Sequence, residues 1–77
     1  MSIRVMLFGP FAEPFPERQV EVKDVVTTNE LEACLKSMHA VFQDYSIRIA
    51  INRKIVDADT TITATDEVAV LPPFSGG

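Results

Sequence analysis

Four stretches of the chain have patterns that predict β-strands, either residues that alternate between two faces or a short continuous apolar run. In the first stretch, residues 3–8, the side chains of Ile3, Val5 and Leu7 share one face. The stretch at 67–71 is apolar on both faces after its first residue, which predicts a central place in the sheet. The other strands are predicted at residues 18–22 and 47–51, with a turn at 52–54 and a short strand at 55–56.

One amphipathic helix is predicted to begin near Thr27. Thr27 and Glu30 have the spacing of a capping box, and Val26 and Leu31 have that of a hydrophobic staple. Apolar residues then recur with the period of one helix face. This stripe consists of Leu31, Cys34, Leu35 and Met38, and Phe42 extends it by a turn.

Two loops separate these elements. Residues 10–17 contain three prolines, which disfavour a regular helix or a central strand. Their two aromatic side chains, Phe11 and Phe15, are expected to pack against the sheet edge. Residues 57–66 are polar and rich in Thr, and are predicted to form a loop that Ile62 anchors.

The order strand, strand, helix, strand, short strand, strand predicts an α+β fold in which one helix covers one face of a small mixed sheet. The first and last strands are the most apolar, so we expect them to form the central pair. This arrangement suits a β-grasp, the ubiquitin-like architecture. Pro72 and Pro73 end the last strand, which predicts a β-grasp domain over residues 1–71 and an extended tail over 72–77.

Composition limits the classes of function. The chain has 77 residues, enough for one domain, and 47% of them are hydrophobic, which argues against disorder. Eleven acidic against seven basic residues give a net charge of −4, which argues against nucleic acid as a ligand. No leader or membrane-spanning stretch is visible, so we expect a cytoplasmic protein that does not bind a membrane. One Cys and one His are too few for a structural metal site.

Catalytic side chains are scarce. His39 has no nucleophile near it in sequence, so we expect a surface or structural role. Cys34 lies on the inward stripe, where a free thiol acts more often as a small hydrophobe than as a persulfide carrier. Asp57 and Asp59 have the spacing to hold a cation, but such loop carboxylates are more often solvated. We therefore expect no bound cofactor, no metal and no enzyme activity of the chain alone.

The C-terminus carries the strongest chemical signal. Six extended residues reach about 20 Å, and the last two have no side chains, which suits insertion into a narrow tunnel on a partner. Joined to AMP as a mixed anhydride, the carboxylate of Gly77 becomes an electrophile for a sulfur or amine nucleophile. Gly77 is thus the predicted reaction site, and the predicted tail and partner-binding residues are Pro72, Pro73, Phe74, Ser75 and Gly76.

Residues 50–52 and 66–77, which end in Pro-Pro-Phe-Ser-Gly-Gly, resemble the ubiquitin-like sulfur carriers of the MoaD/ThiS family. Within this family, they more closely resemble the MoaD-type small subunit of molybdopterin synthase. This resemblance implies that a MoeB-like enzyme uses ATP to adenylate Gly77 and that a sulfur donor protein converts it to a thiocarboxylate. The tail would then enter a MoaE-like large catalytic subunit, in a heterotetramer, and give its sulfur to cyclic pyranopterin monophosphate.

Three alternatives remain open at the level of sequence. The chain could carry sulfur for another product, such as thiamine or another thiolated metabolite. It could instead be a protein modifier that is joined through Gly77 to lysines of its targets, or a plain interaction module. On any partner we expect Phe74 and the exposed sheet face to form the apolar anchor, with acidic residues steering the encounter.

Overall fold

The computed structural model describes residues 2–73, which form a single five-stranded mixed sheet. The strand order is β2-β1-β5-β3-β4. The β1–β5 pair is parallel and the other three pairs are antiparallel, so the predicted pairing of the first and last strands is confirmed. The strands are β1 (Ser2–Leu7), β2 (Gln19–Lys23), β3 (Arg48–Ile51), β4 (Lys54–Val56) and β5 (Val68–Leu71).

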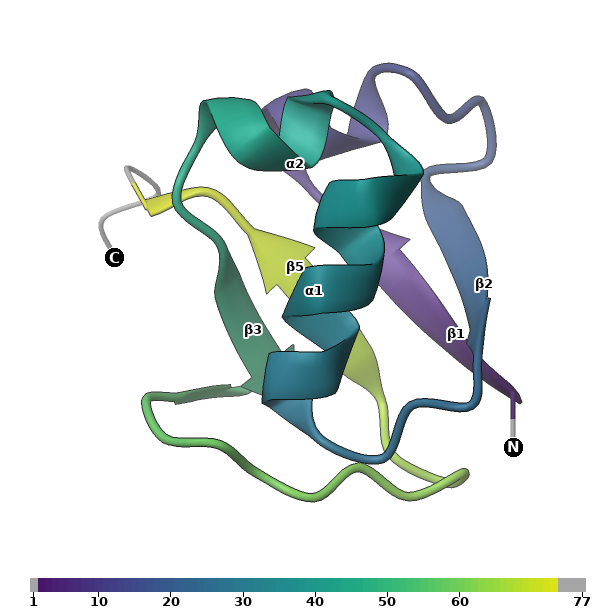
Figure 1. The fold of residues 1–77 in the computed structure, drawn as a ribbon, viewed down its shortest axis with the longest axis vertical. Helices are drawn as coiled ribbons and strands as arrows, with labels where there is room; N and C mark the ends of the chain where they lie inside the picture. The colour runs from purple at the N-terminus through teal and green to yellow at the C-terminus, as the bar shows by residue number, and fades with distance from the viewer. Residues whose placement is uncertain (1, 74–77) are drawn as a thin grey trace.

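Helix α1 (Thr28–Met38) crosses one face of this sheet and leaves the other face without a helix (Figure 1). This arrangement is the predicted β-grasp. No helix within residues 2–73 has the length and apolar character needed to span a bilayer.

The predicted capping box begins α1. The Thr27 hydroxyl accepts a hydrogen bond from the Glu30 N–H at 3.3 Å, and the Glu30 carboxylate accepts from the N–H of Thr27 at 3.3 Å. Val26 of the predicted staple is half exposed, and its contact with Leu31 stays a prediction. The neighbouring Val25 is buried in the core.

The helix also ends earlier than the apolar stripe predicts. His39 has extended dihedrals, φ −155° and ψ 143°, so α1 stops at Met38. Phe42 is buried, but it belongs to a separate short helix, α2 (Val41–Asp44). Within the stripe, Cys34 is only partly buried and Met38 is exposed, which leaves Leu31 and Leu35 as its core residues.

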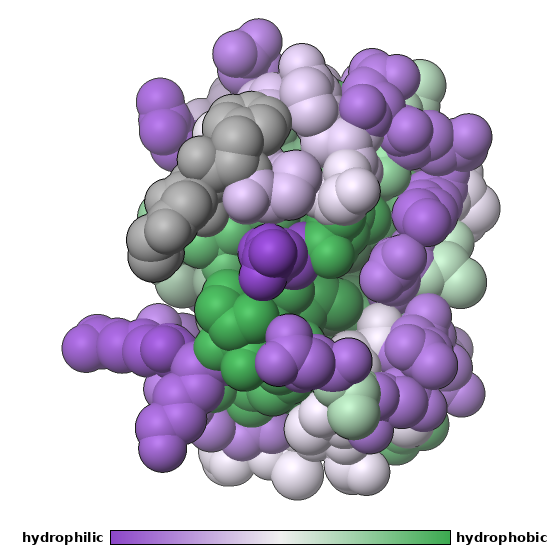
Figure 2. Space-filling model, turned by 90° about the vertical axis from the view of Figure 1, so that its left-hand side faces the viewer, coloured by the Kyte–Doolittle hydropathy of each residue, from purple (hydrophilic) through white to green (hydrophobic). Residues whose placement is uncertain are grey.

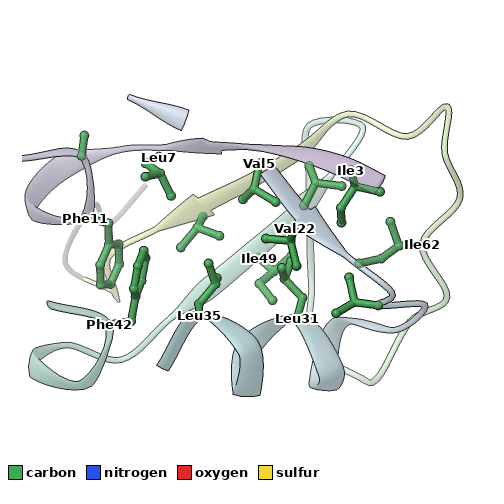
Figure 3. Packing of buried hydrophobic residues seen from close by; sticks show 14 residues of the cluster. Ile3, Val5, Leu7, Phe11, Val22, Leu31, Leu35, Phe42, Ile49 and Ile62 are labelled. Carbon is green, nitrogen blue, oxygen red and sulfur yellow. The ribbon is translucent and has the colours of Figure 1, made fainter. Parts of the chain in front are cut away.

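The aromatic loop enters the core and does not lie at the sheet edge. Residues Gly9–Ala12 form a short 3-10 helix, η1, in which proline at the first turn removes an N–H that would have no helical partner. Phe11 is fully buried and stacks on Phe42, with ring centroids 5.4 Å apart (Figure 3). Phe15 is partly buried beside it and packs against the core. The two rings therefore pack with the core and with Phe42, and not at the sheet edge as predicted.

Candidate functional site

The sheet face opposite α1 presents a row of apolar side chains. Met6 of β1 pairs with Ala69 of β5, Ala69 pairs with Ala50 of β3, and Ala50 pairs with Ile55 of β4. Residues opposite each other in a ladder point to the same face, so these four side chains form one line across the sheet. Phe8 and Leu71 follow two residues further along their strands and share this face.

Together these six residues line a shallow depression of about 400 Å³. We call the surface that they form the outer sheet face. Met6, Phe8 and Ile55 are 41%, 43% and 45% exposed. Large apolar side chains gathered on one exposed face are typical of a protein–protein contact. The sequence shows Phe8 on the outward side of its strand, but it does not reveal the register that joins Ile55 to the same row.

The rim of the outer sheet face carries both signs of charge. Arg53 and Glu67 line its edge, and their side chains pair at 3.5 Å. We expected an acidic rim that steers a partner. The rim of this face instead carries a basic and an acidic residue. Arg53 was not predicted as a site residue, because only the β3–β4 hairpin places it near Glu67.

The chain leaves the sheet beside this face. β5 ends at Leu71, whose side chain lines the outer sheet face, and the next residue, Pro72, is buried. Pro73 is half-buried. The other predicted site residues lie outside the described part of the chain; these are Phe74, Ser75, Gly76 and Gly77.

A second hollow of about 410 Å³ lies between the first turn of α1 and strands β3 and β4, and Pro73 lines one side of it. Figure 2 shows hydrophobic residues gathered on this side of the molecule among hydrophilic ones. Thr28 and Asn29 line the helix end of the hollow, and the Asp59 carboxylate accepts hydrogen bonds from the N–H of Asn29 at 2.9 Å and the hydroxyl of Thr28 at 3.4 Å. Asp59 is thus a structural cap for α1.

The titratable side chains of residues 2–73 do not come together as a catalytic site. The Nδ1 of His39 accepts a hydrogen bond from the N–H of Val41 at 3.0 Å, and its ring meets Phe15 edge to face at 5.6 Å. This geometry supports the structural role expected for His39. Within residues 2–73, no three His, Cys, Asp or Glu side chains gather in a way that would hold a metal ion.

Asp66 is a carboxylate with a perturbed pKa. Its side chain accepts a hydrogen bond from the N–H of Thr63 at 2.8 Å and another from the Asn52 amide at 3.0 Å. These bonds, the first being the larger cause, lower the pKa of Asp66 below its ordinary value of 3.8. Asn52 also accepts from the N–H of Glu67, so this network ties the β3–β4 turn to the start of β5.

Comparison with known proteins identifies relatives of this fold. The sequence profile of the ThiS family matches residues 5–77. The structure of SAMP1 from Haloferax volcanii is 26% identical, with a TM-score of 0.76 and full coverage of both chains. A chain from the complex of subunits 1 and 2 of molybdopterin-converting factor from Helicobacter pylori 26695 is 28% identical, with a TM-score of 0.71 and full coverage of both.

A third structure is similar in fold alone. The HVO 2177 protein of Haloferax volcanii is 22% identical, with a TM-score of 0.71, and the match covers all of this chain and 87% of that one. No curated protein sequence matches the chain significantly.

Proposed function

The chain belongs to the ThiS family, with the ubiquitin-like fold of the MoaD/ThiS-type carriers, and from this we propose that it carries sulfur on the carboxyl group of Gly77. A carboxylate oxygen attacks the α-phosphorus of ATP and pyrophosphate leaves. A sulfide equivalent from a donor protein then attacks the carbonyl carbon of the acyl-adenylate and displaces AMP. The product is a Gly77 thiocarboxylate, whose sulfur passes to cyclic pyranopterin monophosphate during molybdopterin synthesis.

The observation that carries the proposal is the position of the outer sheet face at the end of β5. Leu71, the last residue of this central strand, lines the face, so a protein bound there lies where the C-terminal tail begins. A carrier needs such a surface because its partners, and not its own side chains, supply the chemistry. The described residues offer no competing catalytic centre.

The proposed partners are the proteins that supply the catalytic groups which this chain lacks in its described residues. A MoeB-like enzyme adenylates Gly77, and a MoaE-like large subunit receives the charged tail in a heterotetramer. The similar Helicobacter pylori chain comes from a structure of a two-subunit complex, which favours this assignment over a carrier for thiamine or another thiolated metabolite. Phe74 is proposed to join the outer sheet face in this contact.

The test follows Gly77 through both steps. The chain is incubated with ATP, a MoeB-like enzyme and a sulfur source, and its intact mass is measured. Replacing the terminal oxygen by sulfur adds about 16 Da. Conversion of the pterin with the large subunit then reports the second step. Isopeptide-linked adducts in place of a thiocarboxylate would show a protein modifier.

Two variants make this test specific for Gly77. Adding one alanine after Gly77 moves the carboxylate by about 3.5 Å, and deleting Gly77 withdraws it by the same step. An error above about 1 Å can reduce a positioned reaction about 100-fold. Both variants should therefore be inactive, with an unchanged melting temperature, and Gly77→Ala should be impaired less. Full two-step activity of the extended chain would refute the proposal.

A further inference from the structure

Gly9 and Pro72 are in contact where the parallel β1–β5 pair ends. The ladder extends one residue beyond β1, since the N–H of Phe8 donates to the carbonyl of Val70 at 3.1 Å. Gly9 follows on one strand and the buried Pro72 lies two residues after Val70 on the other. A Cβ on Gly9 would lie 2.9 Å from Cγ and 3.3 Å from Cδ of Pro72. The proline ring therefore occupies the space that a side chain at position 9 would need.

Neither residue is free to move aside. Gly9 begins η1, and the stacking of the buried Phe11 on Phe42 ties η1 to the core. Leu7, just before this turn, donates its N–H to the carbonyl of Arg18 at 2.9 Å, which fastens the other end of the loop. On the opposite side, the ring of Pro72 restricts its own φ. A Cβ at Gly9 would displace Pro72 by about half an ångström or more to restore ordinary van der Waals contact.

We propose that Gly9 is a positioning residue, which sets the place and direction in which the chain leaves the sheet and so aims Gly77 at the partner's active site. This inference rests on the proposed function. Pro72 is the first residue after β5 and Gly77 is five positions further along the sequence, so the orientation of Pro72 sets the direction from which the rest of the chain starts toward the partner. Gly9 contributes no group to the chemistry and acts only through Pro72.

The positive φ of Gly9, 63°, is a separate reason for glycine at this position. Any L-residue with a Cβ is strained there, which reduces stability whether or not Pro72 is near. The experiment must therefore separate two effects of a side chain at position 9. One is a loss of fold stability, and the other is a change in the direction in which the chain leaves the sheet toward Gly77. Pro72→Ala does this, because alanine has no Cγ or Cδ, and the Cβ of residue 72 lies 3.9 Å from the Cβ position of Gly9, an ordinary contact distance.

The experiment measures adenylation of the full chain by a MoeB-like enzyme as ATP–pyrophosphate exchange. The variants are Gly9→Ala, Pro72→Ala and the double variant. We expect Gly9→Ala to lower kcat about tenfold or more with KM changed less than about twofold, since docking through the outer sheet face is preserved. In the Pro72→Ala background, which is itself slower, Gly9→Ala should lower kcat by less than about twofold.

The control for lost stability is Val22→Ala, a core substitution in β2 on the other side of β1 from β5. It should be as unstable as Gly9→Ala or more so, and keep the wild-type kcat. An equal loss of kcat from Gly9→Ala in both backgrounds, or no loss in either, would overturn the role of Gly9 while an active wild type upholds the proposed function. An inactive wild-type chain would overturn both.

Discussion

Alternate residues of β1 and β5 point to opposite faces of one sheet, and the two faces differ in what covers them. On the inner face, Val5 and Val70 have no exposed surface and pack under α1. On the outer face, Met6 and Phe8 remain more than 40% exposed. One set of alternate residues in these strands therefore forms the core, and the other set forms an exposed apolar surface.

On the inner face, burial of apolar side chains stabilises the free protein. On the outer face, the same kind of stabilisation is available only when a partner covers the side chains. Fully burying a large apolar side chain contributes about 1.5–3 kcal/mol. Inner residues have already contributed this free energy to folding. Phe8 and Ile55 have gained only part of it, so a partner that covers the outer sheet face gains the rest. Substitutions on the two faces should therefore affect different measurements.

The largest effect is expected inside the core. Phe42→Ala removes a ring that stacks on Phe11, and the free energy of unfolding should fall by about 3–5 kcal/mol. Urea unfolding followed by circular dichroism measures this loss. If Phe42→Ala proved less destabilising than Phe8→Ala, the distinction between the two faces would be wrong.

The next effect is on binding and not on folding. Phe8→Ala should weaken affinity for the large subunit about 30-fold, as for a hot-spot residue, while the free energy of unfolding changes by about 0.5 kcal/mol or less. Titration calorimetry gives the affinity. Val26→Ala is the matched control, because Val26 is also half exposed but precedes α1, away from the outer sheet face. Equal losses of affinity in both variants would contradict a specific surface.

A smaller effect is expected on α1, where the thiol of Cys34 packs against the core. Cys34 packs against the core without being fully buried, so Cys34→Ala should reduce the free energy of unfolding by about 1 kcal/mol. Sulfur transfer by the folded variant should be retained. A stable but inactive variant would move the sulfur from Gly77 to Cys34.

The smallest effect concerns the turn that keeps β3 and β5 in register. The lowered pKa of Asp66 means that its ionised form stabilises the fold at pH values above 3.8 and that this contribution is lost as the pH falls through the folded-state pKa. Asp66→Asn should therefore lose less stability than the wild type between about pH 5 and about pH 2.5. Urea midpoints at both pH values measure the difference. Identical acid sensitivity of the two proteins would contradict a stabilising role for ionised Asp66.

Much of the fold could be predicted from local signals. The capping box of Thr27 and Glu30 involves residues three apart, and the alternation in β1 involves neighbours, so both are readable from short stretches of sequence. The apolar character of β5 likewise indicated its central position. The Gly-Gly ending predicted Gly77 as the reaction site, and this stays a prediction because Gly77 lies outside the described residues.

Tertiary structure decided what depends on residues far apart in the chain. The loop prolines did not predict that Phe11 would stack on Phe42, since this contact requires η1 and α2 to meet. The outer sheet face exists only in one register, because a slip of one residue would turn Ile55 to the opposite side. The contact of Gly9 with Pro72 depends in the same way on the β1–β5 pairing, since packing distances between strands are set by the whole sheet and not by either segment.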